Sequence, residues 1–152
     1  MVEMETQRIT SLSELNNIAQ GILSLCMREG DKTTATVLGL SGDLGVGKTA
    51  FTKELARLLK IEHEITSPTF VIMKSYPISA NKEYTHLIHI DAYRIESDDE
   101  MRVLGLEEIL NDSTKLVCIE WPEKIQSILP SDTHNITLTL NTDGSRDISY
   151  DI

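Results

Sequence analysis

The stretch GDLGVGKT, residues 42–49, decides the fold of this chain. It matches the pattern G-x-x-x-x-G-K-T, in which glycines let the backbone turn so that its N–H groups wrap a phosphate. An apolar run, residues 35–40, precedes it, and residues 47–60 have leucines at helical spacing. Because a strand, a glycine loop and a helix occur in that order, the stretch predicts a phosphate-binding loop (P-loop) rather than an ordinary glycine-rich turn with an exposed lysine.

The loop also indicates which nucleotide binds. Lys48 is predicted to reach the β- and γ-phosphates, and the Thr49 hydroxyl to bind Mg²⁺. The N-K-x-D motif that reads guanine has its nearest match in NKEY, residues 81–84, which lacks the aspartate. ATP is therefore favoured over GTP. The loop residues predicted to bind ATP or ADP are Gly42, Asp43, Leu44, Gly45, Val46, Gly47, Lys48, Thr49 and Ala50.

Strand and helix patterns alternate along the rest of the chain, which predicts an α/β domain. Helical patterns cover residues 11–30, 97–110 and, more briefly, 122–129. Extended patterns cover 67–78, 84–91 and 115–120. NITLTL and RDISYDI, residues 135–140 and 146–152, flank Asp143-Gly144 and predict a C-terminal β-hairpin that makes the sheet partly antiparallel. We expect residues 1–152 to form a single P-loop ATPase domain.

Composition excludes some classes of protein. The hydrophobic content of 40% suits one packed core, and the net charge of -10 disfavours direct binding of DNA or RNA. No apolar run approaches the roughly 20 residues of a membrane helix, and the N-terminus lacks the layout of a secretion signal. Cys26 and Cys118 are far apart in sequence and are interpreted as reduced thiols. These features predict a cytoplasmic protein without a membrane segment.

Two apolar strands each end in an acid, LIHID at Asp91 and LVCIE at Glu120. Ligands of open α/β sheets bind at the carboxyl ends of the strands, so both acids are candidates for catalysis. One would hold Mg²⁺ while the other orients or deprotonates the attacking water. For either acid alone, a helix cap or a surface charge is the alternative. We favour Glu120 as the metal ligand because its strand is more continuously apolar.

The segment HIDAYR surrounds Asp91. His89 lies two residues before Asp91, so the two side chains share a face of a strand, and His89 either positions Asp91 or is structural. Tyr93 and Arg94 follow at once. Arg94 either stabilises charge in the transition state or pairs with a surface acid.

A second polar segment, Ser67-Pro68-Thr69, lies about 20 residues beyond the P-loop, where many P-loop proteins have a nucleotide-sensing switch. Its hydroxyls are candidates to contact the γ-phosphate, Mg²⁺ or water. An ordinary Ser/Thr-Pro turn before a strand is the alternative. Trp121, the only tryptophan, directly follows Glu120 and is expected in the core or at an interface.

Five segments together resemble the TsaE family of bacteria, the YjeE-type P-loop ATPases of tRNA threonylcarbamoyladenosine synthesis. They are GDLGVGKTAFTKELARLL, ITSPTFVIMKSY, HIDAYR, GLEEI and CIEWPE, which span about residues 39–123. The resemblance implies a P-loop NTPase-like three-layer fold with a mixed, mainly parallel sheet. It also implies binding of ATP or ADP with Mg²⁺, with Trp121 near the nucleotide and Glu120 serving metal binding and hydrolysis. Ser67 to Thr69 would form one switch, and His89, Asp91, Tyr93 and Arg94 a second motif.

The resemblance further implies slow hydrolysis by the isolated protein, which would act on or reset the threonylcarbamoyl-transferase complex. The partners would be the threonylcarbamoyl-transferase subunit and its inactive paralogue, which together modify adenosine 37 of tRNA. The acidic chain would then contact tRNA mainly through these partners, and no DNA or membrane is expected. Two alternatives stay open: a small-molecule kinase of P-loop fold, and a nucleotide-dependent assembly switch that does not hydrolyse ATP. The scattered arginines, with no arginine-rich lid, disfavour the kinase.

Overall fold

The structure, a computed structural model, describes residues 4–27, 30, 32–67 and 71–151. Its strands are β1 (Glu5–Ile9), β2 (Thr36–Ser41), β3 (Met73–Pro77), β4 (His86–Asp91), β5 (Lys115–Glu120), β6 (His134–Leu140) and β7 (Arg146–Tyr150). Its α-helices are α1 (Leu12–Met27), α2 (Lys48–Leu58), α3 (Asp98–Val103) and α4 (Leu106–Leu110). Two short 3₁₀ helices, η1 (Pro122–Lys124) and η2 (Gln126–Ile128), follow β5.

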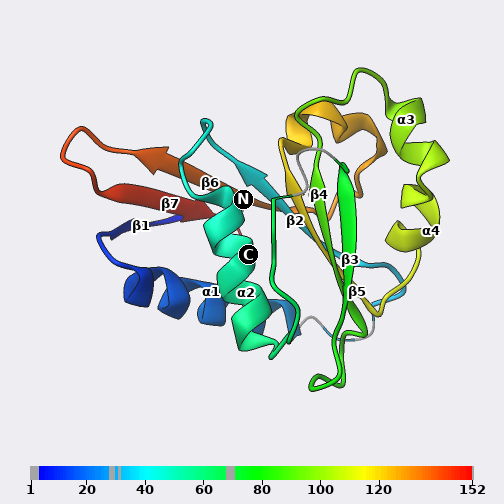
Figure 1. Cartoon of the computed structure of the whole chain (residues 1–152), viewed down its shortest axis with the longest axis horizontal. Helices are drawn as coiled ribbons and strands as arrows, with labels where there is room; N and C mark the ends of the chain where they lie inside the picture. The colour runs from blue at the N-terminus through cyan, green and yellow to red at the C-terminus, as the bar shows by residue number, and fades with distance from the viewer. Residues whose placement is uncertain (1–3, 28–29, 31, 68–70, 152) are drawn as a thin grey trace.

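All the strands belong to one sheet, in the order β1-β7-β6-β2-β5-β4-β3 (Figure 1). Its middle is parallel, because β2 pairs in parallel with both β6 and β5, and β5 with β4. The pairs β1–β7, β6–β7 and β3–β4 toward the two edges are antiparallel. The predicted α/β fold, with a mixed sheet and a C-terminal hairpin, is confirmed.

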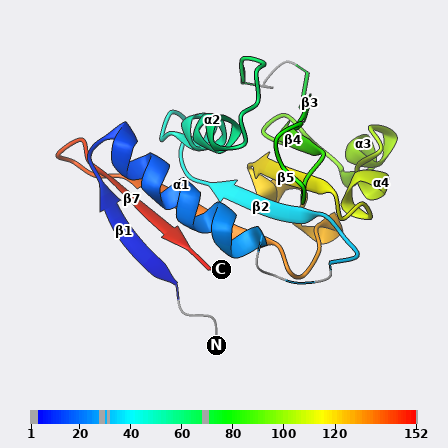
Figure 2. The same cartoon turned by 90° about the horizontal axis from the view of Figure 1, so that it is seen from below.

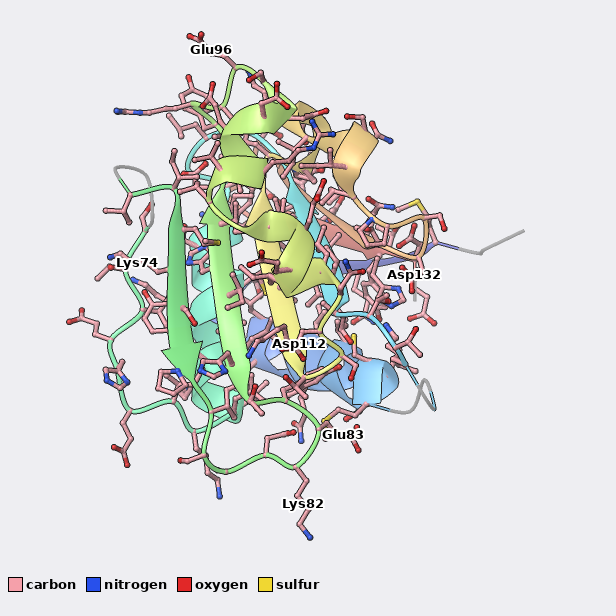
Figure 3. The ribbon with its side chains drawn as sticks, turned by 90° about the vertical axis from the view of Figure 1, so that its right-hand side faces the viewer. Lys74, Lys82, Glu83, Glu96, Asp112 and Asp132 are labelled. Carbon is pink, nitrogen blue, oxygen red and sulfur yellow. The ribbon has the colours of Figure 1, made fainter. Side chains whose placement is uncertain are left out.

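Alternate side chains of the central strands face two separate cores, as the two-residue period of a strand requires. Leu38 and Leu87 pack in the core that contains residues of α1 and α2, whereas Val37 and Ile88 pack in the core that contains residues of α3 and α4. Figure 2 shows α1 and α2 on one side of the sheet, and Figure 3 shows α3 and α4 in front of β4 and β5. Polar residues that alternate with Leu87 along β4 therefore lie on the same face as α2.

The sequence patterns missed or misplaced some local structure. The strand β1 was not predicted, because only Ile9 of its five residues is buried and the rest are exposed. The helix predicted over residues 97–110 is two helices, interrupted by Gly105 with a left-handed φ of 83°. The short helix predicted over 122–129 consists of the two 3₁₀ turns. The helix predicted over 11–30 corresponds to α1, which covers Leu12–Met27. Residues 28 and 29 of the predicted range lie outside the described part.

Both cysteines are free and buried. Burial is the main cause that raises the pKa of the Cys118 thiol, so this side chain stays protonated in the core. In the part of the chain that the structure describes, no helix is long and apolar enough to span a membrane. The cytoplasmic location stays a prediction.

Candidate functional site

The P-loop connects β2 to α2 and depends on glycine at both of its ends. Gly42 has a φ of 146°, and a Cβ there would lie 2.5 Å from the Leu138 carbonyl oxygen and 2.8 Å from Val46 Cγ1. Gly47 has a φ of 117° and forms the N-cap of α2. Both conformations are costly for any residue with a side chain, so the glycine pattern follows directly from the backbone path. The start of α2 then directs its positive end toward any bound phosphate.

Lys48 is buried inside this loop. Its Nζ donates a 2.5 Å hydrogen bond to the Gly42 carbonyl oxygen and lies 3.8 Å from the centre of the Trp121 ring. Burial lowers the pKa of Lys48, and the nearby carboxylates oppose that shift, Glu120 most strongly and Asp91 less. Burial disfavours the charged form of Lys48. A phosphate beside the ammonium would add negative charge that stabilises this charged form. The arrangement fits the predicted role of Lys48.

Thr49 and Glu120 meet across the cleft. Thr49 Oγ1 donates to Glu120 Oε2 over 2.9 Å, and His89 Nε2 lies 2.8 Å from the same oxygen. Glu120 is 5% exposed and His89 is fully buried. The sheet brings them together because β4 and β5 are neighbours in register, with His89 opposite Cys118 and Asp91 opposite Glu120. The side chains of His89, Asp91 and Glu120 lie on the face of the sheet that α2 covers, and Thr49 belongs to the first turn of α2.

Asp91 and the aromatic residues complete the wall. Asp91 is 8% exposed, and its Oδ1 accepts a 3.0 Å hydrogen bond from the Tyr93 backbone N–H. The Tyr93 and Trp121 rings lie 5.2 Å apart, tilted by 50°. Trp121 has a left-handed φ of 60°, which is uncommon for a bulky residue. That backbone turn at the end of β5 places the indole over Lys48.

These residues surround a cleft of about 400 Å³. Its lining consists of Leu44, Gly45, Gly47, Lys48, Thr49, Ala50, Ser67, Asp91, Tyr93, Arg94, Glu120 and Trp121. Of the other predicted site residues, Val46 is buried beneath the loop, and His89 is buried behind Glu120. Gly42 and Asp43 belong to the loop but do not line the cleft. Pro68 and Thr69, two of the predicted switch residues, lie outside the described part of the chain.

Arg146 at the start of β7 is a contact that the motifs did not predict. Its Nε donates a 2.7 Å hydrogen bond to the Val46 carbonyl oxygen, so the C-terminal hairpin holds the P-loop. Arg146 also lines a second cavity of about 290 Å³ with Thr10, Leu12 and Leu138. Gly47 and Ala50 line both cavities, so the two lie on either side of the start of α2. No local motif marks Arg146, because it lies 100 residues from Val46.

The stretch NKEY, the nearest match to a guanine-reading motif, lies away from the P-loop. The Asn81 side chain accepts hydrogen bonds from the backbone N–H groups of Glu83 and Tyr84, which makes a turn before β4. Lys82 and Glu83 project from the end of the molecule opposite Glu96, which follows the HIDAYR segment (Figure 3). This stretch therefore forms an ordinary turn between strands.

The oxygen atoms of the cleft fit a hard divalent cation. Mg²⁺ prefers few protein ligands, typically one or two carboxylates together with phosphate and water oxygens. Thr49 Oγ1 and Glu120 Oε2 supply two such oxygens 2.9 Å apart, and Asp91 lines the same cleft. Within the described residues, no group of three or more His, Cys, Asp or Glu side chains could hold a metal by itself. Two oxygens from side chains fit a cation that also binds phosphate and water oxygens.

The chain matches one family model, several named proteins and a solved structure. The model of the family described as "Threonylcarbamoyl adenosine biosynthesis protein TsaE" matches residues 9–148. The tRNA threonylcarbamoyladenosine biosynthesis protein TsaE of Bacillus subtilis is 41% identical over 115 residues, 75% of this chain and 68% of that protein. The protein of the same name from Borreliella burgdorferi is 45% identical over 93 residues, 61% and 64% of the two chains. The crystal structure of Bacillus subtilis YdiB superposes with a TM-score of 0.74 at 30% identity, over 99% of this chain and 86% of that one.

Proposed function

The chain belongs to the TsaE family, and from that premise we propose that it is a slow, partner-activated ATPase of tRNA threonylcarbamoyladenosine biosynthesis. A part in that biosynthesis is the role for which the family is named. ATP hydrolysis and action on a transferase complex are the proposed steps. The observation that carries the proposal is the contact between Thr49 of the P-loop helix and Glu120 at the end of β5.

The phosphates of ATP would lie in the P-loop. The N-terminus of α2 and the Lys48 ammonium supply positive charge there, and Trp121 covers the lysine. Mg²⁺, bound by the phosphates with Thr49 and Glu120, would neutralise the charge that develops on the β- and γ-phosphates. Glu120 is preferred to Asp91 for this role because Glu120 is the acid that contacts Thr49.

Asp91 is then the candidate to orient the attacking water. Hydrolysis forms a bond between the water oxygen and the γ-phosphorus and breaks the bond from that phosphorus to the β–γ bridging oxygen, while a water proton passes to a base or to phosphate. Asp91 lines the cleft, and the Tyr93 N–H holds one of its oxygens. Arg94 and Ser67 also line the cleft. Their side chains are therefore placed where they could contact the γ-phosphate of ATP, and they would lose that contact when ADP is bound.

The cavity beside Arg146 is the proposed place for the adenine base. It adjoins the start of α2, and the apolar side chains of Leu12, Leu15 and Leu138 line it. A flat, largely apolar ring suits such a lining. The position of NKEY in a distant turn gives no support to guanine.

Regulation by partners is proposed from the general chemistry of phosphoryl transfer. An arginine supplied by a partner raises phosphoryl-transfer rates by about 10³–10⁵ in comparable enzymes, so a single small domain is expected to be slow alone. The proposed partners are the threonylcarbamoyl-transferase subunit and its inactive paralogue. With a net charge of -10, the chain would depend on them to hold the tRNA.

Reconstitution tests this function. The protein is mixed with the transferase pair, tRNA, ATP and threonylcarbamoyl-adenylate, and both phosphate release and modified tRNA are measured over many turnovers. Glu120→Gln should lower hydrolysis by about 100-fold or more and weaken ADP binding in the presence of Mg²⁺, while ADP affinity in EDTA changes little, because the carboxylate is the proposed ligand of the nucleotide-bound cation. Glu108→Gln, a change at an exposed acid of α4, is the control. Modification that proceeds equally well without this protein would refute the role in the complex, and full hydrolysis by Glu120→Gln would refute the site.

A further inference from the structure

The buried histidine of β4 contacts the acid that the proposed function uses. His89 is fully buried, and its Nε2 lies 2.8 Å from Glu120 Oε2. The Thr49 hydroxyl donates to the same oxygen over 2.9 Å. One carboxylate oxygen is therefore held from two sides, by the helix that follows the P-loop and by the central sheet.

The other ring nitrogen indicates where the hydrogen of His89 lies. His89 Nδ1 is buried and has no hydrogen-bond partner among the described residues. A buried N–H without an acceptor is costly, whereas a bare ring nitrogen gives up only an acceptor site. The geometry therefore assigns the hydrogen to Nε2, which donates it to Glu120. A hydrogen on Nδ1 would leave two acceptors facing each other across 2.8 Å.

We propose that His89 is a positioning residue that fixes the Glu120 carboxylate for its work on the nucleotide-bound cation. The proposal rests on the ATPase function proposed above. Thr49 belongs to the segment that would contact the nucleotide, but His89 belongs to a strand that pairs on both sides, with β3 and β5. The imidazole thus ties the carboxylate to a strand in the interior of the sheet. Hydrogen bonds behind a metal-binding carboxylate are typically worth about 10- to 100-fold in metal affinity or activity.

A pair of substitutions separates positioning from packing. His89→Gln keeps an N–H donor at a reach close to that of Nε2, whereas His89→Met has similar volume and no donor. His86→Met, on the same strand but half-buried at its other end, is the matched control. For each protein, ADP affinity is measured in EDTA and again with Mn²⁺ as the probe cation, together with the melting temperature and partner-stimulated hydrolysis.

We expect His89→Met to weaken Mn²⁺-dependent ADP binding and hydrolysis by about 10- to 100-fold. ADP affinity in EDTA should stay within about twofold, because the P-loop contacts do not involve His89. His89→Gln should recover most of the loss, and the control should behave as wild type. Equal losses in Met and Gln variants, or losses that only follow the melting temperature, would overturn the positioning role. If the wild-type protein shows no cation-dependent ADP binding at all, the proposed function itself fails.

A measurement on the unmodified protein guards against variants that do not fold. Imidazole nitrogen NMR of the wild-type protein should show His89 with a protonated Nε2 and a bare Nδ1. A change in the chemical shift of the Nε2 hydrogen in Glu120→Gln, where a neutral amide oxygen replaces the charged acceptor, would support the direct contact. A hydrogen found on Nδ1 alone would overturn the proposal whatever the variants do.

Discussion

The two ends of the neighbouring strands β4 and β5 hold polar clusters of opposite character. At the start of the strands, Lys115 Nζ lies 3.0 Å from His86 Nδ1, 3.2 Å from Thr85 Oγ1 and 3.5 Å from Asp112 Oδ2. These groups are exposed or half-buried. At the carboxyl end, Asp91 and Glu120 are buried beside Lys48, and fully buried His89 shares one oxygen of Glu120 with Thr49.

The two clusters differ in how many charged groups they remove from water, which is the costly part of burying a polar cluster. In the cluster of Lys115, Asp112, His86 and Thr85, the charged groups stay near water. The ion pair between Lys115 and Asp112 therefore costs little desolvation free energy and adds little stability. Below the surface, the Glu120 cluster desolvates two carboxylates and a lysine and leaves a histidine nitrogen without a hydrogen bond among the described residues. Buried polar groups of this kind are costly to the folded state, and they concentrate where a ligand or a reaction needs them. The comparison therefore favours the carboxyl end of the strands as the functional end.

The largest expected effect tests that assignment through the two lysines. Lys48→Ala should weaken ADP and ATP binding by about 10- to 100-fold or more, since a charge-assisted hydrogen bond is worth about 1.5–3 kcal/mol. Lys115→Ala should leave both affinities within about twofold, because it lies at the far end of the strand. Titration calorimetry measures both. Equal affinities for Lys48→Ala and wild type would remove the P-loop assignment.

A smaller effect concerns stability. Glu120→Gln should leave the free energy of unfolding unchanged or raise it by up to about 1 kcal/mol, since the amide avoids burying a charge and still accepts from Thr49 and His89. Lys115→Gln should lower it by less than about 0.5 kcal/mol, as for other partly exposed ion pairs. Urea unfolding provides both values. A loss of more than about 2 kcal/mol in Glu120→Gln would mean that this cluster serves the fold rather than a ligand.

The smallest effect is a pH dependence at the start of the strands. The hydrogen bonds from Thr114, from its side chain first and then its backbone, lower the pKa of Asp112 below its ordinary 3.8. Since the folded state holds this carboxylate ionised, the stabilisation is present above the ordinary pKa and is lost as the pH falls through the lowered value. Melting temperatures between about pH 5 and 2 should thus fall more steeply in wild type than in Asp112→Asn. Parallel curves would contradict the assignment to Asp112.

Local patterns predicted those parts of the fold whose burial repeats at short range. The P-loop, α2, β4 and β5 combine apolar periodicity with a motif, and the structure has all four. β1 escaped because a mostly exposed edge strand has almost no apolar pattern, and its pairing with β7 depends on residues more than 130 positions away. Gly105 in the middle of an otherwise helical pattern was a visible signal of the break between α3 and α4.

The candidate site shows the same division. Lys48, Thr49, Asp91, Glu120 and Trp121 were predicted from motifs, and all five line one cleft. The hydrogen bond between His89 and Glu120 was not foreseen, because which two strands become neighbours is decided by the whole sheet order. Arg146 was missed for the same reason, since its contact with Val46 joins the hairpin to a loop 100 residues earlier in the sequence.

The hydrogen bond from Arg146 to the P-loop also has a consequence for synthesis on the ribosome. The loop emerges early, but the residue that holds its Val46 carbonyl is translated 100 residues later, and β1 gains its partner strand only when β7 is complete. A nascent or prematurely terminated chain therefore contains the entire nucleotide motif without the strand that fixes its shape. Nucleotide affinity should consequently be lower in a chain that ends before Arg146 than in the full sequence.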